Sequence, residues 1–246
     1  MILEICCDSI GSVRAAAEGG ARRVELCSAL GEGGVTPSAG LMRQARLVPG
    51  INMHVLIRPR GGDFVYDEAE VDCMVDDVRV AVDTGADGVV IGALLPDGSI
   101  DTDVCRRLIE AAGCCRNITF HRAFDLCRDP FKSLEDIIAL GCNRLLTSGQ
   151  ARSAEAGMPL LRRLNDQAAG RIVILPGGGV SPANAAAILR GTGCRELHGS
   201  LRENLASAMT YRRDDVAMGA PGTDEYSRPV TSPRLIKETI QAMQSI

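Results

Sequence analysis

One short phrase occurs four times along the chain and constrains its fold more than any other feature. The copies are Gly20-Ala21-Arg22-Arg23-Val24, Gly85-Ala86-Asp87-Gly88-Val89, Gly141-Cys142-Asn143-Arg144-Leu145 and Gly193-Cys194-Arg195-Glu196-Leu197. In each copy a helical pattern ends at the glycine and a strand-like run follows. Glycine suits the left-handed position that closes a helix, and the small residue after it lets the helix and the strand approach closely. The phrase therefore predicts a corner between helix and strand that is used repeatedly.

The runs between these corners predict eight strands, at residues 2–7, 23–27, 52–58, 88–92, 117–121, 144–147, 171–175 and 196–199. Helices fit the intervals between them. Their expected starts are the capping pair Asp67 and Glu70 and the cap-proline pairs Asp129-Pro130, Ser181-Pro182 and Ser232-Pro233. This alternation indicates a parallel sheet with right-handed crossovers.

The length of 246 residues and the lack of a composition break favour one α/β domain over residues 1–246, with the (β/α)8 or TIM-barrel fold. An open, doubly wound sheet is the alternative, because periodicity alone does not establish closure. Residues 209–231 lack clear periodicity, and we expect an irregular segment there, before the last helix.

Composition excludes several classes of function. The formal charge of -4 provides no basic surface for nucleic acid. No segment approaches the roughly 20 apolar residues that span a membrane, and the first residues lack the pattern of a signal peptide, so we expect a cytoplasmic protein with its cysteines as thiols. Lysine occurs only at Lys132 and Lys237, both in helix-like segments, which excludes a Schiff-base aldolase.

Alternation along the strands predicts which side chains face the barrel axis. Val24 and Leu26 are apolar and should face the helices, which turns Glu25 and Cys27 inward. The same alternation groups Glu4 with Cys6 and His198 with Ser200. A buried carboxylate needs a partner, and Arg58 is the predicted counter-charge. Glu4, Glu25 and Arg58 then form either the floor of a ligand pocket or a structural layer of ion pairs.

Two loops that follow strands carry residues suited to an anionic ligand. In Arg58-Pro59-Arg60-Gly61-Gly62 the arginines flank a turn, and the guanidinium group favours carboxylate or phosphate; a surface loop with paired arginines is the alternative. The other loop carries His121, Arg122 and Asp125. We expect His121 to be a general acid or base that Asp125 orients, or else a structural histidine.

A glycine-rich turn, Pro176-Gly177-Gly178-Gly179, leads to the expected helix start at Ser181-Pro182. Backbone amides and a helix N-terminus would converge there, next to His198 and Ser200. Barrels often bind phosphate at this position, so Gly177, Gly178 and Gly179 are candidate ligand-binding residues for phosphate or carboxylate. A tight turn without a ligand is the alternative.

Cys6 and Cys27 are predicted at similar heights on adjacent strands. Two thiolates can hold a soft ion such as Cu(I), whereas zinc favours more ligands. The alternative is that both are buried as small apolar side chains.

Several strings together resemble the CutC copper homeostasis family. They are Leu3-Glu4-Ile5-Cys6, Arg23-Val24-Glu25-Leu26-Cys27, Glu32-Gly33-Gly34-Val35-Thr36-Pro37-Ser38, Ile57-Arg58-Pro59-Arg60-Gly61-Gly62-Asp63-Phe64, Thr119-Phe120-His121-Arg122-Ala123-Phe124-Asp125, Leu146-Thr147-Ser148-Gly149 and Asp224-Glu225-Tyr226-Ser227. The resemblance runs nearly end to end. It implies a cytosolic TIM barrel, a homo-oligomer, a role in copper handling, and Cu(I) binding at Cys6 and Cys27. Gly199 departs from animal members, which can carry cysteine there.

Two hypotheses about function follow. The first is a copper homeostasis protein that binds Cu(I). The second is an enzyme for a small anionic metabolite, phosphorylated or not, with an anion-binding site at the barrel mouth. Its catalytic candidates are His121, Glu25 and Asp125, and its ligand-binding candidates are Glu4, Arg58, Arg60, Arg122, Thr147, Ser148, Gly149, Gly177, Gly178, Gly179, His198 and Ser200. An inert scaffold that acts through its oligomer interface is a third, weaker reading.

Overall fold

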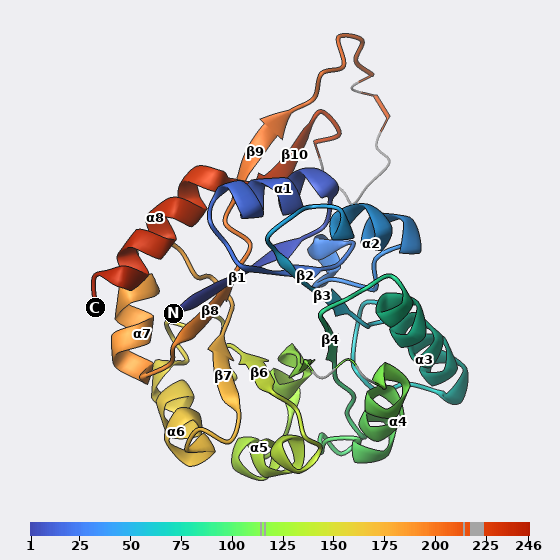
Figure 1. The fold of residues 1–246 in the computed structure, drawn as a ribbon, viewed down its shortest axis with the longest axis vertical. Helices are drawn as coiled ribbons and strands as arrows, with labels where there is room; N and C mark the ends of the chain where they lie inside the picture. Colours follow the sequence, from blue (N-terminus) through green and yellow to red (C-terminus); the bar gives the residue numbers. More distant parts are fainter. Residues whose placement is uncertain (114, 116, 214, 217–223) are drawn as a thin grey trace.

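The computed structural model describes residues 1–113, 115, 117–213, 215–216 and 224–246. Parallel strands surround a central axis and helices pack around them (Figure 1). The strands of this sheet are β1 (Ile2–Cys7), β2 (Arg23–Leu26), β3 (Asn52–Leu56), β4 (Gly88–Ile91), β5 (Ile118–Phe120), β6 (Arg144–Thr147), β7 (Val173–Pro176) and β8 (Glu196–Gly199). Among the described residues, none of the helices combines the length and the apolar character that spanning a membrane requires.

The helices follow the strands along the chain and form the outer layer. They are α1 (Ile10–Glu18), α2 (Ala39–Arg46), α3 (Glu68–Asp83), α4 (Thr102–Ala112), α5 (Pro130–Ala139), α6 (Met158–Ala168), α7 (Ala185–Thr192) and α8 (Pro233–Gln244), with the short 3-10 helices η1 (Leu30–Glu32) and η2 (Arg122–Leu126).

The sheet closes on itself. Its hydrogen-bonded order is β7-β6-β5-β4-β3-β2-β1-β8, so the first strand pairs with the last. A parallel bridge between Gly177 and His198 then joins β7 to β8. The predicted (β/α)8 barrel is therefore confirmed, and the open sheet is excluded.

The four repeated corners have the predicted backbone conformation. The corner glycines have φ of 90° at Gly20, 84° at Gly85, 82° at Gly141 and 71° at Gly193. Glycine lacks the Cβ atom that disfavours this region for other residues. Each corner thus turns the chain from the outer layer of helices back to the inner layer of strands.

Three of the four predicted helix starts are confirmed. Asp67 forms a capping box with Glu70, and Asp129 and Ser232 cap helices that begin with proline. The prediction that a helix starts at Ser181-Pro182 is wrong, because α7 begins at Ala185. The side chain of Asn184 accepts a hydrogen bond from the Ser181 amide at 2.9 Å, and this interaction closes a turn before the helix.

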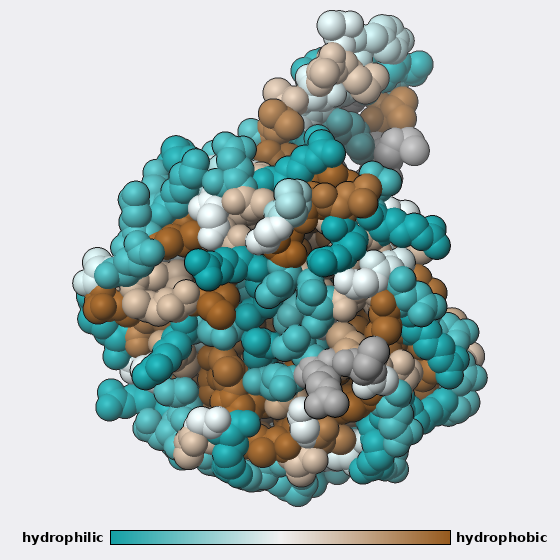
Figure 2. Space-filling model, viewed as in Figure 1, coloured by the Kyte–Doolittle hydropathy of each residue, from teal (hydrophilic) through white to brown (hydrophobic). Residues whose placement is uncertain are grey.

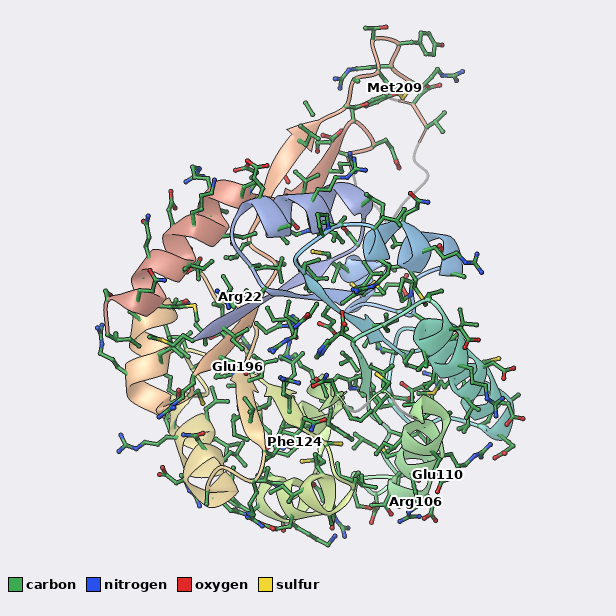
Figure 3. The ribbon with its side chains drawn as sticks, viewed as in Figure 1. Arg22, Arg106, Glu110, Phe124, Glu196 and Met209 are labelled. Carbon is green, nitrogen blue, oxygen red and sulfur yellow. The ribbon has the colours of Figure 1, made fainter. Side chains whose placement is uncertain are left out.

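An antiparallel ribbon projects from the barrel between β8 and α8 (Figure 1). It consists of β9 (Arg202–Ala206) and β10 (Ser227–Thr231), and Met209 lies in the projection beyond them (Figure 3). The predicted irregularity of residues 209–231 is therefore wrong at 227–231. Residues 214 and 217–223 of that segment lie outside the described residues. The ribbon is largely exposed and only Thr231, at the end of β10, is buried, so β10 lacks the apolar alternation that reveals a strand in a sequence.

The core has an outer and an inner part. Val24 and Leu26 are fully buried, and they pack in the same apolar cluster as Val13 of α1. The inner side chains of the barrel are polar near the strand starts, and a small cluster of Cys6, Cys27, Leu56 and Val90 fills the upper interior. The predicted inward direction of Cys27 is consistent with this cluster. Figure 2 shows hydrophilic residues in the middle of one face, over the barrel axis.

Candidate functional site

A layer of ion pairs fills the barrel near the strand starts. Arg23 of β2 lies between two carboxylates and pairs with Glu4 of β1 and Glu196 of β8. Glu196, labelled on β8 in Figure 3, also accepts from Arg144 of β6 at 3.3 Å. Glu4 therefore belongs to a structural layer of ion pairs, which was one of the two alternatives predicted for it. Sequence reasoning missed Arg23, Arg144 and Glu196, although Arg23 and Glu196 each precede an inward residue by two positions.

The predicted counter-charge for Glu4 and Glu25 is wrong. Arg58 lies higher in the barrel, where its guanidinium donates to backbone carbonyls of Glu32 and Gly34 at 2.9 Å and of Gly62 at 2.7 Å. Residues 33, 34 and 62 are glycines with positive φ, and these backbone turns carry the loops over the Arg58 side chain.

A chain of hydrogen bonds leads from the ion-pair layer upward. The Nδ1–H of His198 donates to Glu4 at 2.7 Å, and His198 Nε2 lies 3.3 Å from a Glu25 carboxylate oxygen. Burial alone would raise the pKa of Glu4, but the hydrogen bond from His198 and the charge of Arg23 hold it well below its usual range. Glu4 therefore stays ionised and holds the imidazole of His198 in one orientation.

Glu25 and His198 have pKa values that shift in the same direction. Burial raises the pKa of Glu25 to about 7, and the charge of Glu4 adds to this effect against the opposing influence of His198. Burial lowers the pKa of His198, but the negative charges of Glu25 and Glu4 outweigh it and leave that pKa raised. Glu25 can therefore exchange a proton near neutral pH, and it lies beside a histidine whose pKa is raised.

Two thiols meet beside this pair. The Sγ atoms of Cys6 and Cys27 lie 3.6 Å apart. One ligand atom each from Cys6, Glu25 and His198 lies within 4.8 Å of the others. Sequence reasoning assigned only the two cysteines to a metal, and the tertiary structure adds a carboxylate and an imidazole. We refer to Cys6, Cys27, Glu25 and His198 as the thiol cluster.

A cavity of about 420 Å³ opens above the thiol cluster. The predicted site residues that line it are Cys6, Glu25, Arg58, His121, Arg122, Asp125, Gly178, Gly179, His198 and Ser200. The remaining candidates do not line it: Glu4, Cys27, Arg60, Thr147, Ser148, Gly149 and Gly177.

His121 and Asp125 do not form the predicted pair. His121 Nδ1 accepts the amide N–H of Ala123 at 3.1 Å, whereas Asp125 accepts from Arg122 at 2.7 Å and from the Ser148 hydroxyl at 3.0 Å. The cause is η2, which places Asp125 one turn beyond Arg122 and toward the end of β6. Burial lowers the pKa of His121 to about 3, with a further contribution from the charge of Arg58.

The candidates outside the cavity have structural partners. Arg60 pairs with Glu70 at 2.5 Å and Asp63 at 3.2 Å, on the outer side of its loop. Thr147 donates to Asp125 at 2.5 Å and accepts the Gly149 amide at 2.9 Å. At Gly177 a Cβ atom would lie 2.6 Å from the Leu146 side chain, so this glycine serves close strand packing.

The glycine-rich turn after β7 reaches the cavity with Gly178 and Gly179 only. The expected helix N-terminus does not converge there, because α7 starts later and Asn184 already occupies the Ser181 amide. A phosphate cradle of the predicted kind is therefore not formed by this turn alone.

Fold and site together define a (β/α)8-barrel protein with a buried cluster of thiol, imidazole and carboxylate groups below an open mouth. The chain belongs to the CutC family, whose model matches residues 1–203.

The relatives agree with this assignment. A family protein CutC from Chromobacterium violaceum is 52% identical over 98% of this chain and 98% of that protein. The human copper homeostasis protein cutC homolog is 48% identical, covering 94% of this chain and 84% of its own length. Among solved structures, a copper homeostasis protein CutC from Streptococcus agalactiae has a TM-score of 0.78 at 34% identity, covering 81% of this chain and 98% of that chain.

Proposed function

We propose that the protein acts in copper homeostasis by binding Cu(I) at the thiol cluster. The observation that carries the proposal is the 3.6 Å separation of the Cys6 and Cys27 sulfur atoms inside the barrel. Thiolate ligands select soft ions such as Cu(I), and imidazole also suits copper. The relatives named as copper homeostasis proteins support the same role.

The hydrogen bond between Glu4 and His198 also supports a metal site. Histidines that bind metals commonly donate their other ring N–H to a carboxylate, which orients the ring. Here Nδ1 of His198 donates to Glu4 at 2.7 Å, which leaves Nε2 on the side of Glu25 and Cys6. In this proposal Cys6 and Cys27 bind the ion, His198 adds a nitrogen ligand, and Glu25 balances charge.

Anaerobic titration with Cu(I) against a chromogenic chelator tests this proposal. We expect one tightly bound Cu(I) per chain, and loss of that site in the double variant Cys6→Ser/Cys27→Ser. Cys73 is exposed, so Cys73→Ser is a matched control that should keep the full stoichiometry. Unchanged stoichiometry in the double variant would remove these cysteines from the role, and tighter binding of Zn(II) than of Cu(I) would contradict the choice of metal.

Copper affinity should also depend on pH. The hydrogen bond with Cys27 raises the pKa of Cys6 well above its usual value, and burial adds to this effect. Cu(I) binds the thiolate, so binding at neutral pH releases the Cys6 proton. We expect the affinity to rise about tenfold per pH unit between pH 6 and 8 for each proton released. An affinity that stays constant over this range would show that Cys6 is not a ligand.

The mouth cavity supports a second candidate, an enzyme for a small anionic metabolite. Its support is a cavity of about 420 Å³ in which Glu25, Arg58 and His121 meet. Glu25 would move protons at the cavity floor, while His121 has its Nδ1 occupied by Ala123 and offers only Nε2. A thermal-shift screen with carboxylated and phosphorylated metabolites tests this candidate, and the absence of any stabilisation would count against it.

The family resemblance further leads us to propose a homo-oligomer in the cytoplasm. Eight of the described cysteines are free thiols, which agrees with a reducing compartment. They are Cys6, Cys7, Cys27, Cys73, Cys105, Cys127, Cys142 and Cys194. Light scattering of the purified chain would give the subunit number, and a monomer at micromolar concentration would contradict the oligomer.

A further inference from the structure

Two buried nitrogen atoms at the barrel mouth have no hydrogen-bond partner among the described residues. His121 is 3% exposed and Arg58 is 5% exposed, yet His121 Nε2 and Arg58 Nε are both without a partner. Both side chains line the mouth cavity. Leaving a buried polar group unpaired is costly, so such groups beside a cavity mark atoms that a ligand or an ordered water would satisfy.

The backbone determines which nitrogen of His121 carries the proton. The amide N–H of Ala123 donates to Nδ1 at 3.1 Å, so Nδ1 is an acceptor and holds no proton. A neutral imidazole then carries its proton on Nε2. Burial, which lowers the pKa of His121 to about 3, keeps the ring neutral. His121 is therefore a hydrogen-bond donor at Nε2, and the partner of this atom must be an acceptor.

Arg58 brings a positive charge that no carboxylate neutralises. Within the described part of the chain it forms no ion pair, and its terminal nitrogens donate to backbone carbonyls instead. Arg122, the other arginine of the cavity, already pairs with Asp125 at 2.7 Å. A buried, unpaired cation favours a ligand that supplies the missing negative charge.

One aromatic ring contacts both donors. The ring centroid of Phe64 lies 4.9 Å from the Arg58 guanidinium carbon and 5.1 Å from the centroid of the His121 ring. Gly92 leaves room for this arrangement, because a Cβ atom there would lie 2.5 Å from the imidazole. The two donors thus belong to one packed unit, and their positions are set before any ligand binds.

We propose that this unit binds the carboxylate of a small organic acid, which accepts hydrogen bonds from His121 Nε2 and Arg58 Nε. A single negative charge matches the single unpaired cation. Glu25 and Asp125 also line the cavity and disfavour a dianion such as phosphate. Leu56 and Val180 provide apolar walls for the hydrocarbon part of the acid. The inference does not depend on copper binding, and it gives a substrate class to the enzyme candidate.

Acetate is the probe, because any carboxylate site of this kind should accept it whatever the hydrocarbon part of the natural ligand. The titrations use the copper-free chain with a chelator present, at constant ionic strength, so that failure of copper binding and failure of this site are separable. Nitrogen-15 NMR of the imidazole reports the tautomer and the Nε2 environment. We expect a protonated Nε2 and a saturable shift with a dissociation constant in about the millimolar range, as suits so small a ligand.

Two substitutions of His121 separate the donor from the acceptor. His121→Gln keeps a donor near the Nε2 position, and we expect acetate affinity within about threefold of the parent chain. His121→Asn keeps an acceptor near Nδ1 but loses the distant donor, and we expect a loss of about tenfold or more. Arg58→Gln should weaken binding similarly, while Arg106→Gln, an exposed matched control, should leave it unchanged.

Several outcomes would overturn the proposal. The first is a proton on Nδ1 of His121 instead of Nε2. The second is the lack of a saturable shift up to about 100 mM acetate, a concentration well beyond the millimolar affinity expected of so small a ligand. The third is equal binding of acetamide, the neutral isostere of acetate. Binding of inorganic phosphate more tightly than acetate would contradict the carboxylate class. The first two measurements use the parent chain alone, so they remain decisive even where a variant fails to fold.

Discussion

Single buried histidines show how strongly the interior of this barrel controls charge. His54 lies inside β3 and is 2% exposed, and burial lowers its pKa to about 4 against the opposing charge of Glu4. The folded state thus keeps His54 neutral at a pH where the unfolded chain binds a proton. His121 behaves in the same way.

This difference predicts acid sensitivity. Because the pKa of His54 is lower in the folded state than the unfolded value of about 6.5, stability is full above pH 6.5 and falls as the pH drops toward 4. We expect His54 to account for about 2 to 3 kcal/mol of the stability lost between pH 7 and 4.5. Urea unfolding of the parent chain and His54→Gln at both pH values measures this. Equal losses in the two proteins would contradict the assignment.

At the scale of elements, the four helix-to-strand corners share one backbone conformation. The corner glycine has positive φ, and the chain enters the next strand within three residues. Gly141 is the clearest case for a test, because a Cβ atom there would have no atom within 4 Å. Any cost of a side chain at this position must come from the backbone conformation alone.

We therefore expect Gly141→Ala to lower the free energy of unfolding by about 1 to 2 kcal/mol. The matched control is Gly31→Ala, because Gly31 also has no atom near its Cβ position but lacks positive φ. It should be nearly neutral. Chemical denaturation of both variants measures the difference, and a neutral Gly141→Ala would show that this corner tolerates an ordinary residue.

At the scale of the whole molecule, the ion-pair layer connects strands that are distant in sequence. Arg23 of β2 joins Glu4 of β1 to Glu196 of β8, and these strands are neighbours only because the barrel closes. Removing one member of a buried pair leaves an uncompensated charge, which is more costly than losing the attraction itself.

Arg23→Met should accordingly destabilise the protein by about 3 to 5 kcal/mol. The reason is that two buried carboxylates lose the cation they share, while among the described residues Glu4 keeps only His198 and Glu196 keeps only Arg144. The control is Arg79→Met, which breaks an exposed pair with Asp76 and should cost less than about 1 kcal/mol. Thermal and urea unfolding compare the two. Similar small effects would contradict a stabilising role of the ion-pair layer.

Local signals in the sequence determined the order of elements in this protein. The corner glycines, the cap at Asp67 and the alternation in Val24-Glu25-Leu26 act over a few residues, so one chain segment contains all the information needed to predict them. The inward direction of Glu25 and His198 follows from the same alternation. The start of α7 at Ala185 and the largely exposed strand β10 escaped prediction, because neither a turn closed by the Asn184 side chain nor a ribbon with little buried surface leaves a periodic trace in the sequence.

Only the tertiary structure decided which polar groups are partners. Arg58 and Asp125 were expected beside Glu25 and His121, yet loop carbonyls bind Arg58 and the end of β6 binds Asp125. Charges and hydrogen bonds act through space over a few ångströms, and distances of that size between residues far apart in sequence are set by barrel closure and loop paths. The thiol cluster shows the same effect. Its groups come from β1, β2 and β8 and from the residue that follows β2, and they become neighbours only in the folded chain.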